Sequence, residues 1–385
     1  MTNPIGPLTH ADEGFCHQIV DTFAVVGSTD LSWTEKVCAM AAARDGSIQL
    51  AFGLGKYTNR NVMDAYAGTS RGAEQTTVRA SRRLAPDPEL TVVGPIRYEV
   101  IEPLRRVRFA LEPNDVQPIA FDWLFEAALP PQFEDRTHSR AGYRVSAELV
   151  RYHQIGRCSG WLEIDGDRIE LSPQTWVSTR DHSWGVRYGV GADRTDVEPA
   201  PADPNGFYHF FWTPSLLERP DGTAYGVFMV MNHFRRTGLD QKATWGTIEH
   251  PDGRVERMVD IVPELAYDPV NRRLRGGQVH CKMTDGSNRT LQVEVVSDTG
   301  FHLGTGLYFG LDGHHHGEWR GDLHVDGERI LDCTTAENAR RVHQIRDTVV
   351  RITDPDGGGT GYGNWQPIAS GSMPELGLDA STSFM

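Results

Sequence analysis

The sequence predicts an all-β protein, and three observations indicate this fold class. Apolar residues recur with a period of two, as in residues 224–234, where both faces of the expected strand are largely apolar. Asp-Gly pairs fall at short intervals between apolar runs, and this dipeptide suits the positive φ angles of tight hairpin turns. Patterns with the period of a helix are scarce. We therefore expect antiparallel strands arranged as a meander, sandwich or barrel.

The individual elements follow from the position of these signals. Helix is plausible only locally, across Trp33–Ala43, and a strand is the alternative there. Hairpin turns are expected at the Asp-Gly pairs, which are Asp45-Gly46, Asp165-Gly166, Asp221-Gly222, Asp252-Gly253, Asp285-Gly286, Asp312-Gly313 and Asp326-Gly327.

Length and an internal repeat predict two domains. Single cores stop growing at roughly 250 to 300 residues, and this chain has 385. Residues 162–169 match residues 323–330 position by position, and an Arg-Asp pair follows each copy, as Arg180-Asp181 and Arg346-Asp347. The alternative is that any Asp-Gly hairpin looks like this. With the Pro-rich and Asp-rich stretch 192–206 as a linker, we expect an N-terminal domain over residues 1–195 and a C-terminal domain over residues 206–370.

Composition excludes several function classes. The net charge of −14 and the pI near 5.5 argue against nucleic acid as a partner, because phosphate binding needs a basic face. The first residues carry no secretory signal, and no apolar stretch is long enough to cross a bilayer. We expect a soluble, cytoplasmic protein without membrane insertion, and the sequence does not indicate an oligomeric state.

Cysteine and glycine spacing argue against common cofactors. The five cysteines are widely spaced and contain no Cys-x-x-Cys pair, which fits reduced thiols better than disulfides or a zinc site. Gly53-x-Gly55 lacks the third glycine of a dinucleotide fingerprint, and no phosphate-binding loop motif occurs. NAD, FAD and ATP are therefore not expected as cofactors.

The run Arg180-Asp-His-Ser-Trp-Gly-Val-Arg187 concentrates chemistry in a sequence that otherwise predicts strands. With it occur further short motifs, at His17-Gln18 and in residues 55–64, 102–104, 151–160, 315–321 and 361–363. Together these motifs resemble the tandem lipocalin-like group that includes the AttH-like proteins, the hydroxyneurosporene synthase or carotenoid 1,2-hydratase proteins, and lipocalin-like cyclases. The resemblance covers nearly the whole chain. Thr179 departs from it where a glycine is usual, and Trp365-Gln366 departs from it where an acidic residue is common.

The resemblance implies a specific architecture. It implies two tandem lipocalin-like, calycin-type antiparallel β-barrel domains that pack side by side, with a ligand pocket in one barrel or between the two. It implies no organic cofactor. Similar proteins hydrate isoprenoid double bonds, direct cycloadditions or have no established activity, and the fold alone does not determine which.

Asp181 is the candidate general acid. An apolar pocket would raise the pKa of its carboxyl so that it keeps its proton near neutral pH. The alternative is an ion pair with Arg180 or Arg187, which would lower the pKa and give Asp181 a structural role.

His182 and Trp184 fall on the opposite face from Asp181 if the run is extended, because successive side chains of a strand alternate. His182 is a candidate for proton handling, and Trp184 for an aromatic wall that stabilises a carbocation by cation-π attraction. Ordinary packing between the two halves is the alternative for both residues.

The expected strand 207–212 also alternates, with Tyr208 and Trp212 on one face and His209 on the other. Tyr208 and His209 are candidates for proton transfer, and core packing is the alternative. The candidate pocket residues are Trp184, Arg187, Trp212, Met229 and Met231.

His314-His315-His316 permits a metal hypothesis, because alternate imidazoles on a strand share one face. The run follows Asp312-Gly313, and the preferred interpretation is a surface turn without metal. No metal is therefore predicted.

Together these observations predict a cofactor-free enzyme acting on a hydrophobic isoprenoid or polycyclic small molecule. The expected chemistry is acid-base hydration or dehydration, isomerisation or cyclisation at a C=C bond, which is the work of a lyase or isomerase. The alternative is a lipid or terpenoid carrier without turnover.

Overall fold

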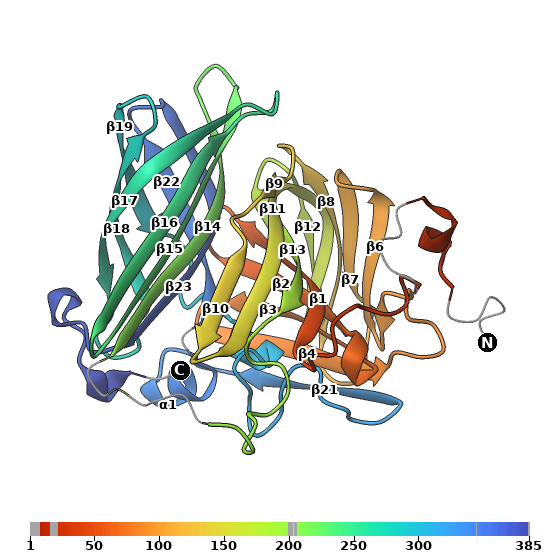
Figure 1. Cartoon of the computed structure of the whole chain (residues 1–385). Coiled ribbons are helices and arrows are strands. Elements are labelled where there is room, and N and C mark those ends of the chain that lie inside the picture. The colour runs from red at the N-terminus through yellow and green to blue at the C-terminus, as the bar shows by residue number, and fades with distance from the viewer. Residues whose placement is uncertain (1–7, 16–21, 199–202, 204–205, 344, 384–385) are drawn as a thin grey trace.

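The computed structural model describes residues 8–15, 22–198, 203, 206–343 and 345–383, and it confirms the all-β fold class. Two β units stand side by side (Figure 1), a curled first sheet and a closed second barrel. Parts of the predicted linker 192–206 lie outside the described residues.

Within the described residues, the first sheet has fourteen antiparallel strands, eleven of them in one continuous path. Along that path the order is β21 (Leu323–Ile330), β4 (Glu74–Arg83), β3 (Val62–Arg71), β2 (Ile48–Tyr57), β1 (Trp33–Ala43), β13 (Trp176–Val186), β11 (Arg144–Ile164), β8 (Ile119–Ala127), β7 (Arg106–Leu111), β6 (Ile96–Glu102) and β5 (Val92–Val93). The short strands β9 (Gln132–Phe133), β10 (Thr137–Ala141) and β12 (Asp167–Leu171) pair with the long strand β11.

The first sheet curls until its ends nearly meet. Arg82 of β4 connects them, because its Nε donates to the carbonyl of Val92 in β5 at 2.8 Å. The inner face is packed with aromatic rings, in which Phe109 lies 4.9 Å from both Phe52 and Trp123 between ring centroids. This core is continuous from β1 to β8.

Among the described residues, the second barrel has eight strands that close on themselves. In order they are β19 (Asn288–Val295), β18 (Leu274–Met283), β17 (Val255–Tyr267), β16 (Leu239–Glu249), β15 (Ala224–Arg236), β14 (Phe207–Glu218), β23 (Gly359–Gly371) and β22 (Arg346–Asp354), which pairs back to β19, and β20 (Phe301–His302) adds to β22. Helical structure is limited to α1 (Ala336–Arg341) and the 3-10 turns η1 (His10–Glu13), η2 (Thr58–Arg60), η3 (Leu303–Gly306), η4 (Pro374–Leu376) and η5 (Ala380–Thr382) among the described residues.

Trp33–Ala43 is strand β1, so the helix considered for this segment is wrong and the strand alternative holds. The reason is tertiary, since β1 lies between β2 and β13 and both of its faces are covered. Ala39 and Ala41 face the first core, whereas Met40 and Ala42 face the second barrel. Helix propensity is overridden when sheet partners satisfy the backbone on both sides.

The internal repeat has different structures in its two copies. Asp165-Gly166 forms the turn between β11 and β12, and Gly166 has a φ of +87°. Asp326-Gly327, by contrast, lies within the single strand β21, which pairs with β4 along its whole length. Residues 323–330 therefore extend the first sheet at its edge, below β4 in Figure 1, although they follow most of the second barrel in the chain.

The outer face of β1, β2, β3, β11 and β13 packs against the second barrel at β14, β15, β16, β22 and β23, and we call this contact the interface. At one end of the interface, Met40, Ala42 and Val177 meet Val349 and Tyr362. Small residues on β1 and β2 allow the close approach. Side chains of β13 alternate between this interface and the first core, as the sequence predicts for an extended strand.

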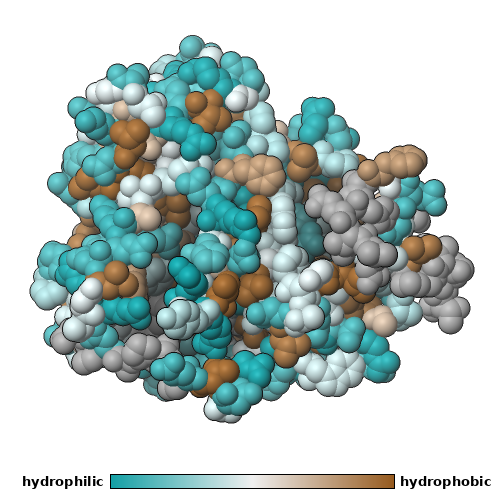
Figure 2. Space-filling view, in the orientation of Figure 1, coloured by the Kyte–Doolittle hydropathy of each residue, from teal (hydrophilic) through white to brown (hydrophobic). Residues whose placement is uncertain are grey.

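The surface is largely hydrophilic on the face shown in Figure 2, with hydrophobic residues scattered among polar ones. The four described cysteines, Cys38, Cys158, Cys281 and Cys333, are free thiols, and Cys16 lies outside the described residues. No described helix has both the length and the apolar character needed to cross a membrane.

Two Asp-Gly turns provide a test of the interface. Gly46 has a φ of +75°, and a Cβ there would lie 2.0 Å from the carbonyl oxygen of Val296 next to β19. Gly166 has a φ of +87° and no atom within 4 Å of such a Cβ. We expect Gly166→Ala to cost about 1–2 kcal/mol for its backbone conformation alone, and Gly46→Ala about 2–5 kcal/mol because overpacking adds to it. Urea unfolding of both variants measures the difference, and equal costs would contradict this packing.

Candidate functional site

The interface buries a cluster of ionisable groups around Asp181. Asp181 pairs in register with Cys38 of β1 and His153 of β11, and its side chain faces the second barrel. Its Oδ2 lies 3.4 Å from Nε of Arg151. Burial raises the pKa of the Asp181 carboxyl, Arg151 opposes that effect and Glu134 adds to it. The predicted ion-pair partners Arg180 and Arg187 are replaced by an arginine from the neighbouring strand.

A second buried carboxyl, that of Asp347, enters the interface from β22. Asn364 Nδ2 and Gln366 Nε2 donate to its Oδ1 at 2.9 and 2.6 Å. Burial raises the pKa of Asp347 to about 6, although both amides lower it, and the charge of Asp181 raises it further. No cation forms an ion pair with this carboxyl within the described part of the chain, and with a pKa of about 6 the carboxyl is half protonated at about pH 6.

Tyr66 lies near both carboxyls, since the charges of Asp181 and Asp347 both affect its hydroxyl. Its ring stacks on Phe301 at 6.3 Å and meets Tyr308 edge-on at 6.2 Å between centroids. Burial raises the pKa of the Tyr66 hydroxyl, and the nearby Cys38, Tyr308, Asp347 and Asp181 raise it further. The two carboxyls therefore share an aromatic surrounding.

Lys36, His316 and Asp64 form a row along the same face. Lys36 Nζ lies 2.8 Å from Nε2 of His316 and 4.1 Å from the centroid of the Tyr308 ring. Asp64 Oδ2 lies 3.6 Å from the other ring nitrogen of His316 and accepts from the Gly317 amide at 2.7 Å. Burial lowers the pKa of Lys36 to about 8 and that of His316 to about 4. A proton near neutral pH therefore resides on the lysine rather than on the histidine.

Several buried polar groups near the carboxyls have no hydrogen-bond partner among the described residues. These are Thr179 Oγ1, Asn364 Oδ1 and both polar atoms of the Gln49 side chain. Thr179 shares a face of β13 with Asp181, and Asn364 bonds Asp347 through its other atom. Because buried polar groups are normally hydrogen-bonded, these groups are available to polar atoms of a ligand.

Four of the nine predicted site residues lie at the interface. These four residues are Asp181, Arg187, Tyr208 and Trp212. Arg187 Nη2 donates to Ser183 Oγ at 2.6 Å. Tyr208 donates to Asn232 Oδ1 at 3.0 Å. Trp212 Nε1 donates to Glu134 Oε1 at 2.8 Å.

The other five lie elsewhere. His182 and Trp184 are on the inner face of the first sheet, where His182 Nε2 lies 2.9 Å from Glu35 Oε1. His209, Met229 and Met231 face the interior of the second barrel, where His209 Nε2 lies 2.8 Å from the Tyr267 hydroxyl and burial lowers the pKa of His209 to about 4. The predicted residues thus do not converge on one pocket, because alternation divides each strand between two faces.

Sequence reasoning missed Asp347, Lys36 and Arg151. The Arg-Asp pair after the second repeat was a signal for Asp347, since it matches Arg180-Asp181 in the first half. Gln366, in the Trp365-Gln366 pair where the resemblance implies an acidic residue, is one of the two amides that donate to Asp347. Lys36 carried no signal, because it lies in the segment whose period was ambiguous.

The three successive histidines diverge in the structure. His316 is buried against Lys36, whereas His314 Nδ1 lies 3.0 Å from Glu318 Oε2 in a partly exposed turn. Over the ranges that the structure describes, no three His, Cys, Asp or Glu side chains gather as metal ligands.

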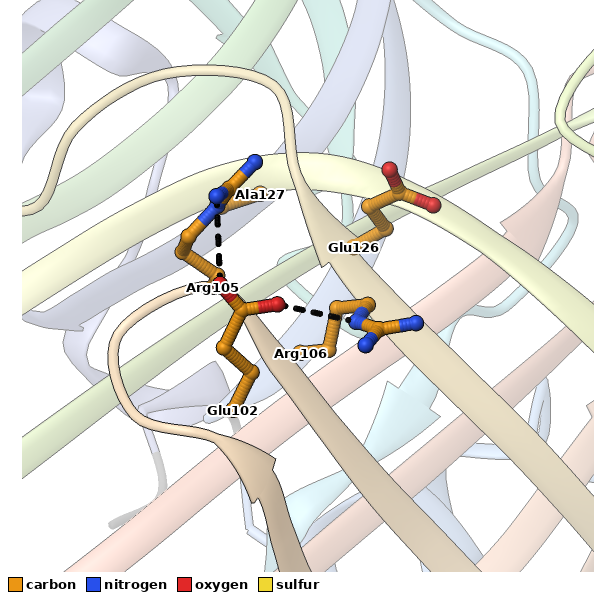
Figure 3. A pocket seen from close by; sticks show the side chains of 5 residues that line it. All are labelled: Glu102, Arg105, Arg106, Glu126 and Ala127. Atoms are coloured by element: carbon orange, nitrogen blue, oxygen red, sulfur yellow. Dashed lines mark hydrogen bonds and ion pairs between the residues drawn. The ribbon is translucent and has the colours of Figure 1, made fainter.

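A surface cleft of about 260 Å³ is lined by Glu102, Arg105, Arg106, Glu126 and Ala127 (Figure 3). Glu102 forms ion pairs with Arg105 at 3.1 Å and Arg106 at 3.2 Å. The charges of this cleft are largely neutralised by one another in solvent, which makes it a weaker candidate than the interface.

The interface is also tied together by a buried ionic contact. His153 of β11 lies 2.8 Å from Glu249 Oε1 of the second barrel and 3.4 Å from Glu134 Oε1, and its ring stacks on Phe228 at 3.7 Å. Burial disfavours the charged imidazole, but the two carboxylates outweigh that effect and raise the pKa of His153 to about 9.

Comparisons place the chain among known folds. The sequence matches the profile of a family described as a family of unknown function, DUF8625, over residues 8–373. A search of the curated proteins returned no match. The AttH-like protein from Nitrosomonas europaea has a similar structure, with 14% identity, a TM-score of 0.50, and coverage of 87% of this chain and 91% of the other.

Two further solved structures have lower TM-scores. Kievitone hydratase from Nectria haematococca has 11% identity, a TM-score of 0.42 and coverage of 90% and 93% of the two chains. CghA with Sch210972 has 11% identity, a TM-score of 0.47 and coverage of 88% of each chain. At such identities likeness concerns the fold, and the tandem lipocalin-like architecture implied by the sequence motifs is confirmed at that level.

The charge of His153 predicts a pH-dependent stability. A histidine whose pKa is about 9 in the folded chain and about 6.5 in the unfolded chain stabilises the fold fully below the lower value. That stabilisation is lost as the pH rises through the higher value. Relative to wild type, His153→Gln should be destabilised at about pH 6, and the gap in unfolding free energy should narrow by about 3 kcal/mol by about pH 10.

Chemical denaturation across this pH range measures the gap. His233→Gln is the matched control, because His233 pairs with Asp240 at a half-exposed position outside the interface. A constant gap for His153→Gln would show that folding does not raise the pKa of the His153 imidazole.

Proposed function

This chain belongs to DUF8625, a family of unknown function, and we propose that it is an acid-base enzyme that protonates a C=C bond of a hydrophobic small molecule at the interface. The observation that carries the proposal is the buried carboxyl of Asp347, whose pKa of about 6 leaves it able to donate a proton near neutral pH. The substrate class is isoprenoid or polycyclic, and the reaction is hydration or dehydration, isomerisation or cyclisation.

Asp347 is a better proton donor than Asp181, although the sequence alone favoured Asp181. Arg151 stands 3.4 Å from Asp181 and stabilises its ionised form. The partners of Asp347 are the neutral amides of Asn364 and Gln366, and both donate to Oδ1. Oδ2 is therefore the oxygen that carries the proton.

The reaction balances without a cofactor. Proton transfer from Asp347 to one alkene carbon leaves a carbocation on the other and a carboxylate on the enzyme. In hydration, water adds to the cation and returns a proton to Asp347. In isomerisation or cyclisation, the carboxylate recovers the proton from a neighbouring carbon.

The aromatic surrounding supports the intermediate. The rings of Tyr66 and Tyr308 lie on the same face as the carboxyls. Each ring face contributes roughly 0.5 to 2 kcal/mol to a nearby cation. The carboxylate form of Asp181, which Arg151 favours, interacts favourably with positive charge that develops beside it.

One observation favours the alternative of a carrier without turnover. Asp181 is held in an ion pair with Arg151, as a purely structural carboxylate would be. A carrier would bind the same hydrophobic molecules at the interface and release them unchanged.

We expect Asp347→Asn to lower turnover by about 100-fold or more, since general acid catalysis contributes at least that factor. A panel of acyclic and cyclic terpenoids is incubated in isotopically labelled water, and products are analysed for label and changed skeleton by mass spectrometry. Asp260→Asn, at an exposed position of β17, is the matched control. A folded, fully active Asp347→Asn variant excludes Asp347 as the acid, and binding without turnover across the panel identifies a carrier.

The pH profile tests the same group independently. The acid must be protonated to react, so kcat/KM should be constant well below pH 6 and fall about tenfold for each pH unit above the Asp347 pKa of about 6. A profile that rises through this range would assign the group as a base instead.

A further inference from the structure

Arg180 occupies the first sheet on the side away from the interface. It pairs in register with Ala39 of β1 and Gln154 of β11, and Ala39 belongs to the first core. Its side chain is 2% exposed. Arg180 and Asp181 are adjacent in the chain, but their side chains enter different buried environments.

The guanidinium of Arg180 is only partly satisfied. Nη2 donates to Oε1 of Gln154, and Gln154 is itself held by its Nε2 donating to the Leu104 carbonyl at 2.7 Å. Nε and Nη1 have no hydrogen-bond partner, and no carboxylate forms an ion pair with Arg180 in the part of the chain that the structure describes. Buried charges are normally paired, so these two donors indicate a site for an anion.

The matching arginine of the second half shows the contrast. Arg346 is also buried, and its Nη2 donates to the Asn271 carbonyl at 2.9 Å. Arg272, a third buried arginine, donates to the carbonyl of Ala369 at 2.7 Å. Backbone carbonyls thus accept hydrogen bonds from the buried arginines that have a structural role in this protein. Arg180, by contrast, keeps N–H donors without an acceptor.

Aromatic side chains surround the guanidinium. It lies 5.5 Å from the ring centroids of both Phe125 and Tyr152. Tyr98 is close enough for Arg180 to lower the pKa of its hydroxyl, against the larger raising effect of burial. These walls suit a flat apolar molecule that carries one negative charge.

The same face leads from Arg180 toward solvent. Trp184 lies edge-on to Tyr152 at 6.5 Å and to Phe133 at 6.4 Å between centroids. Phe133 is 67% exposed. The carboxylate of Glu35 on this face lies 2.9 Å from His182 and forms no ion pair with Arg180 among the described residues.

We propose that the inner face of the first sheet binds a small aromatic carboxylate, with its carboxylate on Arg180 and its ring against Tyr152 and Trp184. A guanidinium is the side chain best suited to a carboxylate, because its planar donors match the two oxygens. This binding site is separate from the interface and does not depend on the activity proposed there.

A matched ligand pair tests the charge requirement. Binding of cinnamate and of cinnamyl alcohol to the full-length protein is measured by isothermal titration calorimetry. We expect a Kd for cinnamate at least tenfold lower than that for the alcohol. Equal affinities for the two, or no binding of cinnamate, overturn the proposal. Decanoate, a carboxylate without a ring, is titrated in parallel. If its Kd is equal to or lower than that of cinnamate, the site does not select an aromatic ring and that part of the proposal is overturned.

Variants then locate the site. Arg180→Gln should raise the Kd for cinnamate to that for the alcohol, and Arg180→Lys should retain part of the preference. Arg144→Gln, at an exposed position of the same sheet, should leave the Kd for cinnamate unchanged. Unaltered cinnamate binding by folded Arg180→Gln overturns the assignment.

A further variant covers the case in which Arg180→Gln does not fold. Trp184→Ala removes the proposed aromatic wall and leaves the guanidinium, so it should weaken cinnamate more than decanoate. Asp347→Asn should leave cinnamate binding unchanged, and loss of binding in that variant would place the ligand at the interface instead.

Discussion

Strand β13 is buried on both faces, and the placement of the charged groups in this protein depends on that constraint. Successive side chains of an extended strand point to opposite sides. The run 180–187 therefore supplies Asp181 to the interface and Arg180 and His182 to the first core. If β13 lay at the surface, the side chains of one of its two faces would be in water. Their charges would then be screened, and their pKa values would be close to normal.

Burial alone does not distinguish the two carboxyls at the interface, but their partners do. Asp181 has the cation Arg151 at 3.4 Å, whereas Asp347 has amide donors at 2.6 and 2.9 Å. A nearby cation favours the ionised carboxyl more strongly than neutral donors do. The same desolvated environment therefore contains one carboxyl beside a cation and one held by neutral amides, an arrangement that separates the roles of charge stabilisation and proton donation.

The features that the sequence predicted are those that depend on local residue patterns. Alternation and Asp-Gly turns indicated antiparallel strands and correctly divided the faces of β13 and β14. The sequence did not predict which distant segments pair as neighbouring strands. Residues 323–330 look like a hairpin locally, yet they lie along β4, because Gly327 allows the Thr77 carbonyl to approach where a Cβ would be 2.4 Å away. Lys36 and Arg151 escaped notice for the same reason, since their importance comes from partners on other strands.

The two Arg-Asp pairs show how similar sequences acquire different roles. Both aspartates reach the interface, and both arginines are buried. Arg346 lies beside the carbonyls of Asn271 and Thr299, which accept its donors. Arg180 lies in the middle of a continuous sheet, where neighbouring carbonyls are used by strand pairing. The Gln154 side chain accepts from it and the Tyr98 hydroxyl also interacts with it, but Nε and Nη1 have no partner among the described residues. The N–H groups of a buried arginine thus find hydrogen-bond acceptors only where free carbonyls lie nearby. Arg180 lies inside a sheet, so some of its N–H groups remain available to a ligand.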